Sequence, residues 1–301
     1  MKFSIITPVY NGEKYIAETI KSVLSQKGNF EIEYIIRDGG STDGTTVIIK
    51  KYEEKLKNNT WPIQCAGITF QWASEKDGGM YDAINKGFTN ATGHIFAWIN
   101  ADDKYLPGTF ATVSNIFLYY PNIQWIKGIN TTCDENGKTI SLGTGTLYSR
   151  EWLAAGIYGR NAYFVQQDSV FWKKSLWQKA HPQISQFRLA GDYALWTTFA
   201  KYEPLWSFNS RVSVFRKRLG QLSGNMQKYN HEQALIAPHH YFLEKRVSLL
   251  FYLINFLKVS GNSMLAKVLY RLFFPFHRLE CYIDFDSDNK PVIRRSKSYL
   301  I

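Results

Sequence analysis

The chain has 301 residues, of which 45% are hydrophobic and 16% aromatic, so it is long enough for a large folded domain and too apolar to be disordered. Its net charge is +11, and all of the basic excess lies in the second part: residues 1–120 carry 12 Lys and Arg against 13 Asp and Glu, and residues 121–301 carry 24 against 12. Cys65, Cys133 and Cys281 lie too far apart for a disulfide framework or a zinc knuckle. The apolar run at the N-terminus is too short for a signal peptide, so we expect a cytoplasmic protein.

The first part of the chain alternates between predicted strands and helices. Short apolar runs predict four strands, KFSIITPVY ending at Pro8, EIEYIIRD, ITFQWAS and HIFAWI. Apolar residues at helical spacing predict three intervening helices, with stripes formed by Ile16, Ile20, Val23 and Leu24, by Ile48, Ile49, Tyr52 and Leu56, and by Tyr81, Ile84 and Phe88. This βαβ alternation predicts an α/β fold with a largely parallel sheet.

Acidic residues follow three of these strands. Because the carboxyl ends of parallel strands meet at one edge, we expect Asp38, Asp77 and Asp102 to lie along that edge, where ligands bind in open α/β sheets. Asn100, Asp102 and Asp103 directly follow HIFAWI. Adjacent carboxylates repel unless a divalent cation or hydrogen-bond donors neutralise them, and hard oxygen ligands suit Mg²⁺ or Mn²⁺. A polar turn that closes the strand is the alternative.

Three segments in this order resemble glycosyltransferase family 2, which has the GT-A fold: TPVYNGEKYIAETIKSVLSQ, EYIIRDGGSTDGT and SEKDGGMYDAINKGFTNATGHIFAWINADD. The resemblance is strongest to bacterial members that build surface polysaccharides such as O-antigen or capsule. It implies a GT-A domain over residues 1–235, with a Rossmann-like, mostly parallel central sheet flanked by helices. Residues 1–105 then form the nucleotide-sugar half and residues 106–235 the acceptor half. The implied reaction is inverting transfer from a nucleoside-diphosphate sugar to a hydroxyl of a glycan, which we expect to be lipid-linked.

The resemblance also implies roles for residues near the nucleotide. Thr7, Pro8 and Tyr10 match a loop around the base and ribose. Asp38 matches an acidic residue that accepts a hydrogen bond from the base, and its alternative role is to hold the GGSTDG turn. Family members commonly have a second Asp at the next position, where this chain has Gly39.

Further matches concern the diphosphate and the metal. Asp77 matches a position beside the nucleotide. Lys86 matches a basic residue directed toward the diphosphate, with a solvated helix lysine as the alternative. Asn100, Asp102 and Asp103 match the DXD motif, which implies Mn²⁺ or Mg²⁺ bound through Asp102 or Asp103. The sequence leaves open which of the two coordinates the metal.

The acceptor half carries the predicted catalytic base. Asp192 begins a predicted helix in LAGDYALWTTFAKY and matches the acidic residue that takes the proton from the attacking hydroxyl; helix capping is the alternative. Asp168 is the rival carboxylate, in a segment predicted as a strand lining the acceptor groove, where Gln166 and Gln167 bind sugar hydroxyls. Arg218 stands where family members often have His, and we expect it to neutralise a phosphate.

Residues 236–301 are predicted to form a helical, basic and hydrophobic C-terminal region, with residues 284–301 as a short hairpin or frayed end. The longest apolar run, 247–257, is about half of what a bilayer span needs. We expect residues 240–280 to lie on the inner face of the cell membrane, where basic side chains meet anionic lipid. Packing on the core and a homodimer contact are the alternatives.

Other functional classes fit the sequence less well. No G-x-G-x-x-G follows the first strand, which argues against a dinucleotide-dependent oxidoreductase. The basic residues lie among long aliphatic runs, so we expect no nucleic-acid partner. A nucleic-acid-binding protein, or a nucleotide-binding α/β protein without catalytic activity, remains the alternative function.

Overall fold

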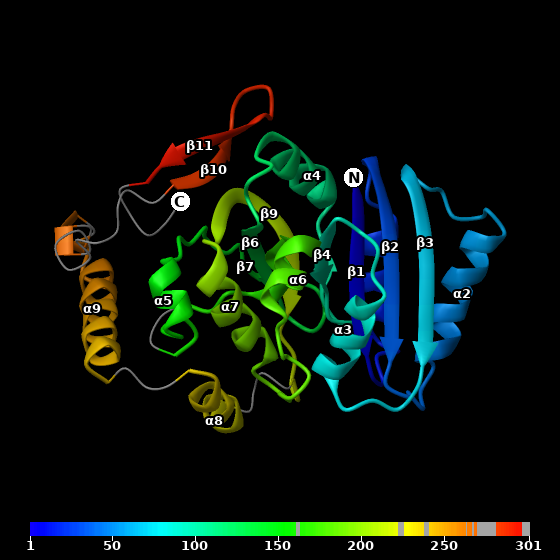
Figure 1. The fold of residues 1–301 in the computed structure, drawn as a ribbon, viewed down its shortest axis with the longest axis horizontal. Helices are drawn as coiled ribbons and strands as arrows, with labels where there is room; N and C mark the ends of the chain where they lie inside the picture. The colour runs from blue at the N-terminus through cyan, green and yellow to red at the C-terminus, as the bar shows by residue number, and fades with distance from the viewer. Residues whose placement is uncertain are drawn as a thin grey trace.

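The computed structural model describes residues 1–160, 163–221, 226–237, 241–262, 264–266, 268–269 and 281–296. A mixed sheet with the order β11-β10-β9-β6-β8-β4-β1-β2-β3 forms its centre (Figure 1). In the first part, four parallel strands alternate with three helices: β1 (Lys2–Val9), α1 (Ile16–Leu24), β2 (Gly28–Asp38), α2 (Thr45–Lys57), β3 (Cys65–Ser74), α3 (Met80–Thr89) and β4 (Ile95–Trp98). The predicted α/β alternation and parallel pairing are confirmed.

Helices cover both faces of the sheet, which is why its strands are nearly continuous apolar runs. On one face, Phe3 and Ile5 of β1 pack with apolar side chains of α1, α2 and α4 (Thr109–Tyr119). On the other face, Ile6 and Trp98 pack with α3, α6 (Lys174–Ala180) and α7 (Gly191–Tyr202). The two layers leave the carboxyl ends of the strands open as a common edge.

Residues 104–216 complete the sheet with strands of both directions. The remaining elements of this stretch are β5 (Lys104–Tyr105), β6 (Trp125–Cys133), β7 (Thr139–Ser141), α5 (Arg150–Ala154), the 3₁₀ turn η1 (Gln167–Ser169), β8 (Val170–Lys173) and β9 (Trp206–Arg216). β8 runs antiparallel to both of its neighbours, β4 and β6, whereas β6 and β9 are parallel. β5 pairs with the end of β9, which brings the chain after Arg216 beside the loop that follows β4.

The C-terminal region contains α8 (Met226–Ile236), α9 (Tyr241–Val259), β10 (Cys281–Phe285) and β11 (Pro291–Arg295). The predicted short hairpin within residues 284–301 is confirmed, although it begins earlier, at Cys281. It extends the sheet, because β10 pairs with β9 through Ile283 and Phe208. The sheet edge gives these strands partners that the local sequence does not reveal.

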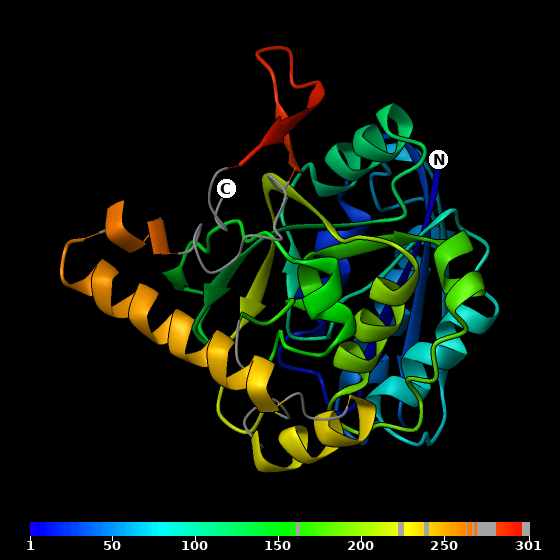
Figure 2. The ribbon, with the colours of Figure 1, turned by 60° about the vertical axis from the view of Figure 1, so that its left-hand side comes forward.

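Helix α9 lies at the periphery of the molecule (Figure 2). Val247, Leu250 and Ile254 pack on Ile157, so one face of the helix is fixed to the core. Its other face exposes apolar side chains, namely Leu249, Tyr252, Phe256 and Val259. Within the described part of the chain, no helix has the length and apolar content required to cross a membrane.

Candidate active site

The carboxyl ends of β1, β2 and β3 lie side by side at the lower edge of the sheet in Figure 1, because Val9 pairs with Asp38 and Asp38 with Ser74. The loops beyond the strands are in contact as well. A Cβ atom at Gly39 would lie 3.0 Å from Oδ2 of Asp77, and one at Gly12 would lie 3.5 Å from the Cβ of Ala101. The predicted common edge therefore exists.

Asp38 is only 2% exposed and holds the turn after β2. Its carboxylate accepts hydrogen bonds from the backbone N–H of Ser41 (3.1 Å) and from the hydroxyls of Ser41 and Ser74. The structure also gives a reason for Gly39. An Asp at that position would bring a second carboxylate against Asp77, and like charges at that distance repel.

The first loop presents one aromatic ring. Thr7 is fully buried, and its hydroxyl lies 3.0 Å from that of Tyr34 in the interior. Pro8 is buried too, whereas Tyr10 is 66% exposed just beyond the strand. The side chains of Thr7 and Pro8 are thus buried, and Tyr10 is the exposed side chain of the three. The contact of this loop with a base and ribose stays a prediction.

Asp77 and Lys86 are both engaged within α3 and its preceding turn. Asp77 accepts a hydrogen bond from the N–H of Gly79 (2.8 Å). The ammonium of Lys86 lies 3.0 Å from Oδ2 of Asp82, four residues earlier on the same helix, so the two side chains form an ion pair. The contact of Lys86 with a diphosphate stays a prediction, since it requires Lys86 to leave Asp82.

Asp102 and Asp103 point in different directions. Oδ2 of Asp102 lies 2.7 Å from Nε of Arg218, near the surface. Asp103 is 1% exposed, and its Oδ1 accepts the N–H of Arg216 (2.8 Å). Burial, with the neighbouring carboxylates of Asp102 and Asp168, raises the pKa of Asp103 well above its usual range. Asp103 is thus an interior group.

This geometry fits a divalent cation at Asp102 rather than at Asp103. Oδ1 of Asn100 is buried without a hydrogen-bond partner in the described residues, as an oxygen ligand awaiting a donor or a cation would be. Among those residues, no group of three His, Cys, Asp or Glu side chains is arranged to hold a metal alone. Mg²⁺ commonly takes one or two carboxylates together with substrate phosphates and water, so a cation held by Asp102 and Asn100 stays a prediction.

Arg216 holds the end of β9 in place, a role that the sequence did not predict. Its guanidinium is buried and lies 2.8 Å from the carboxylate of Glu18, 3.0 Å from the carbonyl oxygen of Asp102 and 4.6 Å from the ring centre of Tyr15. These contacts tie the end of β9 to α1 and to the loop after β4. Arg218 therefore reaches Asp102 from a fixed point.

Asp168 lies in the interior, where it cannot meet an acceptor. It is fully buried beside Lys127, and burial raises the pKa of Asp168 and lowers the pKa of Lys127 to about 8. The predicted strand around it is wrong for Gln167–Ser169, which form a 3₁₀ turn. Gln167 is buried as well, and its amide donates to Asp103 (3.4 Å).

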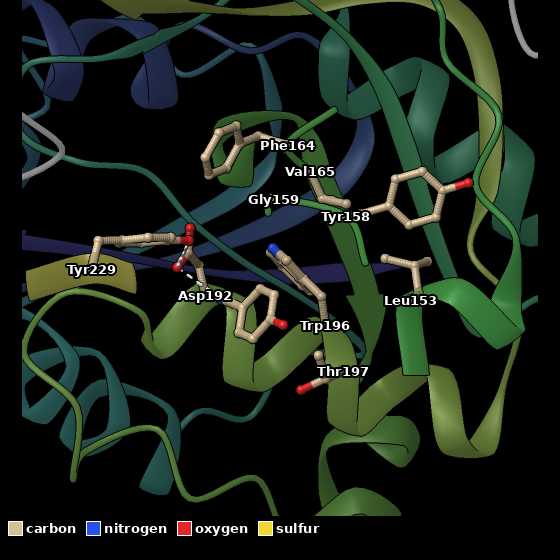
Figure 3. Close-up of a pocket in the computed structure, with 10 residues that line it drawn as sticks. Leu153, Tyr158, Gly159, Phe164, Val165, Asp192, Trp196, Thr197 and Tyr229 are labelled. Carbon is tan, nitrogen blue, oxygen red and sulfur yellow. Dashed lines mark hydrogen bonds between the residues drawn. The ribbon is translucent and has the colours of Figure 1, made fainter. Parts of the chain in front are cut away.

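Asp192 occupies the first turn of α7 and lines a small pocket (Figure 3). Its Oδ1 accepts the N–H of Tyr193 (2.8 Å) and the hydroxyl of Tyr229 (3.2 Å). Burial raises the pKa of Asp192 to about 6, although these bonds and the hydroxyl of Tyr81 lower it. A carboxylate with this pKa suits general-base catalysis near neutral pH.

The pocket around Asp192 is mainly apolar and aromatic, and its other lining residues are Leu153, Tyr158, Gly159, Phe164, Val165, Tyr193, Trp196, Thr197 and Tyr229. Nε1 of Trp196 is buried and has no hydrogen-bond partner in the described residues. Gly191 is required beside Asp192, because a Cβ there would lie 2.5 Å from the ring of Tyr81. The guanidinium of Arg188 would lie 3.4 Å from a Cβ at Gly79, so the loop before α7 also borders the start of α3.

Comparison with known proteins agrees with this architecture. The chain is 34% identical over 121 residues to the minor teichoic acid biosynthesis protein GgaB of Bacillus subtilis, which covers 40% of this chain and 12% of that protein. It is 29% identical over 185 residues to an uncharacterised glycosyltransferase of Nostoc, covering 60% of this chain and 54% of that protein. The chain thus spans less than two thirds of the length of these relatives.

Solved structures show the same fold. Staphylococcus aureus TarS 1–349 in complex with UDP-GlcNAc matches with a TM-score of 0.56 and 16% identity, over 90% of this chain and 81% of that one. This likeness confirms the predicted GT-A fold. The model of the family described as glycosyl transferase family 2 matches residues 4–178, which is more than half of the chain. The protein therefore belongs to glycosyltransferase family 2.

Proposed function

We propose that this protein is an inverting glycosyltransferase that moves a sugar from a nucleoside-diphosphate sugar to a hydroxyl group of a glycan acceptor. The observation that supports this proposal best is the carboxylate of Asp192, which lines a pocket and whose pKa burial raises to about 6. The UDP-GlcNAc bound by TarS supports a nucleotide-sugar donor, and the name of GgaB supports a surface glycan as acceptor.

The nucleotide is proposed to bind at the carboxyl ends of β1, β2 and β3. Tyr10 offers an exposed ring for stacking on the base. Asp38 has three hydrogen bonds from Ser41 and Ser74, and a carboxylate has about four lone-pair sites, so it retains capacity for one N–H of the base. Asp77 lies beside Asp38 and is proposed to border the same nucleotide.

The diphosphate is proposed to lie near Asp102 and Arg218. A diphosphate would compete with Asp102 for the guanidinium of Arg218, because a guanidinium can form bidentate hydrogen bonds with phosphate oxygens. Asp102 and Asn100 would hold Mn²⁺ or Mg²⁺, which when bound supplies Lewis-acid stabilisation of the leaving diphosphate. Lys86 is a further candidate for a phosphate contact once it parts from Asp82.

The proposed reaction is a single displacement at the anomeric carbon. The acceptor hydroxyl oxygen attacks from the face opposite the diphosphate, while its proton passes to the carboxylate of Asp192. The bond between the anomeric carbon and the diphosphate oxygen breaks, and its electron pair leaves with the diphosphate. Attack from the opposite face inverts the configuration, and the general base contributes roughly 10²- to 10⁴-fold in rate.

Helix α9 supports a lipid-linked acceptor at the inner face of the cell membrane. Leu249, Tyr252, Phe256 and Val259 are 60%, 67%, 61% and 91% exposed and follow one another at helical spacing. Lys245 and Arg246 at the same helix are exposed too, and the second part of the chain carries the whole basic excess. An apolar stripe beside cations suits an anionic lipid surface. We therefore propose a peripheral, cytoplasmic enzyme.

Thermal-shift measurements with nucleoside diphosphates test this function. The wild-type protein is heated with UDP, GDP, CDP or ADP, in the presence of either MnCl₂ or EDTA. We expect one of them to raise the melting temperature, and more so with Mn²⁺, because a ligand of the folded state stabilises it. The corresponding nucleotide sugars should then release that diphosphate during turnover. No binding refutes the proposal, and binding without turnover identifies a nucleotide-binding protein without activity.

A further inference from the structure

Helix α8 places three neighbouring side chains on the region of Asp192. Tyr229, Glu232 and Gln233 share one face of this helix, at the spacing that brings side chains together. Tyr229 is buried, and its hydroxyl lies 3.2 Å from Oδ1 of Asp192. Figure 3 shows the ring of Tyr229 reaching this carboxylate from outside α7, which carries Asp192 itself.

The carboxylate of Glu232 binds the segment that leads into α7. It accepts three backbone hydrogen bonds, from the N–H of Arg188 (3.0 Å), Leu189 (2.9 Å) and Ala190 (2.8 Å). These residues directly precede Gly191, the first residue of α7. Hydrogen bonds to a carboxylate are about twice as strong as neutral ones, so Glu232 fixes the direction in which the chain enters the helix. The position of Asp192 depends on that direction.

The C-terminal end of helix α8 is fixed by Arg160. The guanidinium of Arg160 donates to the carbonyl oxygens of Gln233 and Ala237, and it lies 3.3 Å from the carboxylate of Glu244. Cations near the last carbonyls of a helix are favourable. Gln233 is fully buried and adjoins Gly159, a residue of the pocket wall. Helix α8 is therefore a fixed wall of the site.

We propose that Tyr229 and Glu232 are positioning residues for the catalytic base: Glu232 sets the path of the backbone before Asp192, and Tyr229 orients its carboxylate and favours the ionised form. The inference rests on the proposed function, in which Asp192 accepts the proton of the acceptor. It adds that helix α8, which lies outside the residues matched by the family model, supplies the side chains that hold Asp192 in position.

The charged and titratable groups around Asp192 come from four elements. They are Tyr81 on α3, Arg188 in the loop before α7, Tyr193 on α7, and Tyr229 and Glu232 on α8, with Arg160 5.5 Å from the ring centre of Tyr193. Both Tyr81 and Tyr229 lower the pKa of Asp192 by hydrogen bonding, against the larger effect of burial. Removal of the Tyr229 hydroxyl should therefore raise that pKa.

The first test replaces Tyr229 with Phe in the full chain, with Leu235→Ala as the matched control, because Leu235 is 69% exposed on the outer face of α8. The pH profile of nucleoside-diphosphate release is measured for each protein, with the nucleotide sugar whose diphosphate raises the melting temperature of the wild type. We expect the acid limb of Tyr229→Phe to move upward by roughly one pH unit and activity to recover at higher pH, since a hydrogen bond to a charged group has about that effect. Leu235→Ala should match the wild type.

A second pair of measurements does not depend on turnover. Carbon-13 NMR titration of the Asp192 carboxyl gives its pKa in wild type and Tyr229→Phe. Hydrogen exchange of the amides of residues 188–190 is compared in Glu232→Ala, Glu232→Gln and wild type. We expect exchange about tenfold or more faster in Glu232→Ala, with Glu232→Gln in between because its carbonyl still accepts a hydrogen bond.

These readouts separate the two proposals. If no nucleotide sugar is turned over, the proposed function fails, while a raised Asp192 pKa and faster exchange still support the positioning roles. An unchanged Asp192 pKa and acid limb in a folded Tyr229→Phe variant overturn the role of Tyr229. Unchanged exchange at residues 188–190 in Glu232→Ala overturns the role of Glu232.

Discussion

Replacing Asp192 with Asn should make the protein more stable while it removes transfer activity. Burial raises the pKa of Asp192 from 3.8 to about 6, which corresponds to about 3 kcal/mol at 1.36 kcal/mol per pH unit. The folded state binds the proton more tightly than the unfolded state, so this group costs stability as the pH rises from about 4 to about 6. Asn does not ionise. Its folded state should therefore be more stable than wild type at pH 7 by up to about 3 kcal/mol.

Urea unfolding at pH 7 and at pH 4 measures this difference, and the gain should vanish at pH 4, where wild-type Asp192 is protonated in the folded state. Transfer should fall by roughly 10²- to 10⁴-fold with nucleotide binding retained. Asp288→Asn is the matched control, because Asp288 is exposed in the turn between β10 and β11, where it pairs with Lys290. Unchanged turnover of Asp192→Asn, or a loss of stability at pH 7, would refute the reasoning.

Three further changes test the proposed nucleotide and metal site at the carboxyl ends of the strands and the proposed membrane contact of α9. Asp102→Asn should abolish the extra UDP affinity that Mn²⁺ confers, measured by calorimetry with and without EDTA; an unchanged Mn²⁺ effect contradicts the proposed ligand. Gly39→Asp should lower the free energy of unfolding by about 1–3 kcal/mol, and by more than Gly39→Ala, because the new carboxylate lies against that of Asp77. If urea unfolding shows the same loss for both variants, repulsion between the two carboxylates is excluded as the cause. The double change Tyr252→Ser with Phe256→Ser should reduce flotation with anionic vesicles several-fold at an unchanged melting temperature. Unchanged flotation, or a shift from dimer to monomer, would contradict membrane contact.

Sequence patterns predicted the parallel part of the fold because each strand there is a local apolar run that ends at a polar turn. The family resemblance gave Asp192, and the structure provides it with a pocket. The sequence could not predict in which direction each of two adjacent side chains points. Asp102 and Asp103 are adjacent, yet only Asp103 faces the interior, because β5 and β9 pair above it.

Contacts between distant segments account for the other differences. The hairpin of β10 and β11 depends on the free edge of β9, about 70 residues earlier. Tyr229 and Glu232 carry no signal in their own helix, since Tyr or Glu at the surface of a helix is common. Their relation to Asp192 arises only when α8 packs beside α7, and hydrophobic spacing says nothing about that partner.

The close fit of Tyr81 against Gly191 joins α3 to the start of α7. Tyr81 lies in the first turn of α3, and its hydroxyl donates to the carbonyl oxygen of Leu189 (3.0 Å). If the proposed donor changes the position of α3, it would also change the proton affinity of Asp192, and by thermodynamic linkage each would alter the other by the same factor. An empty enzyme and a loaded one would differ in how readily they activate water, which bears on how much donor is lost to hydrolysis.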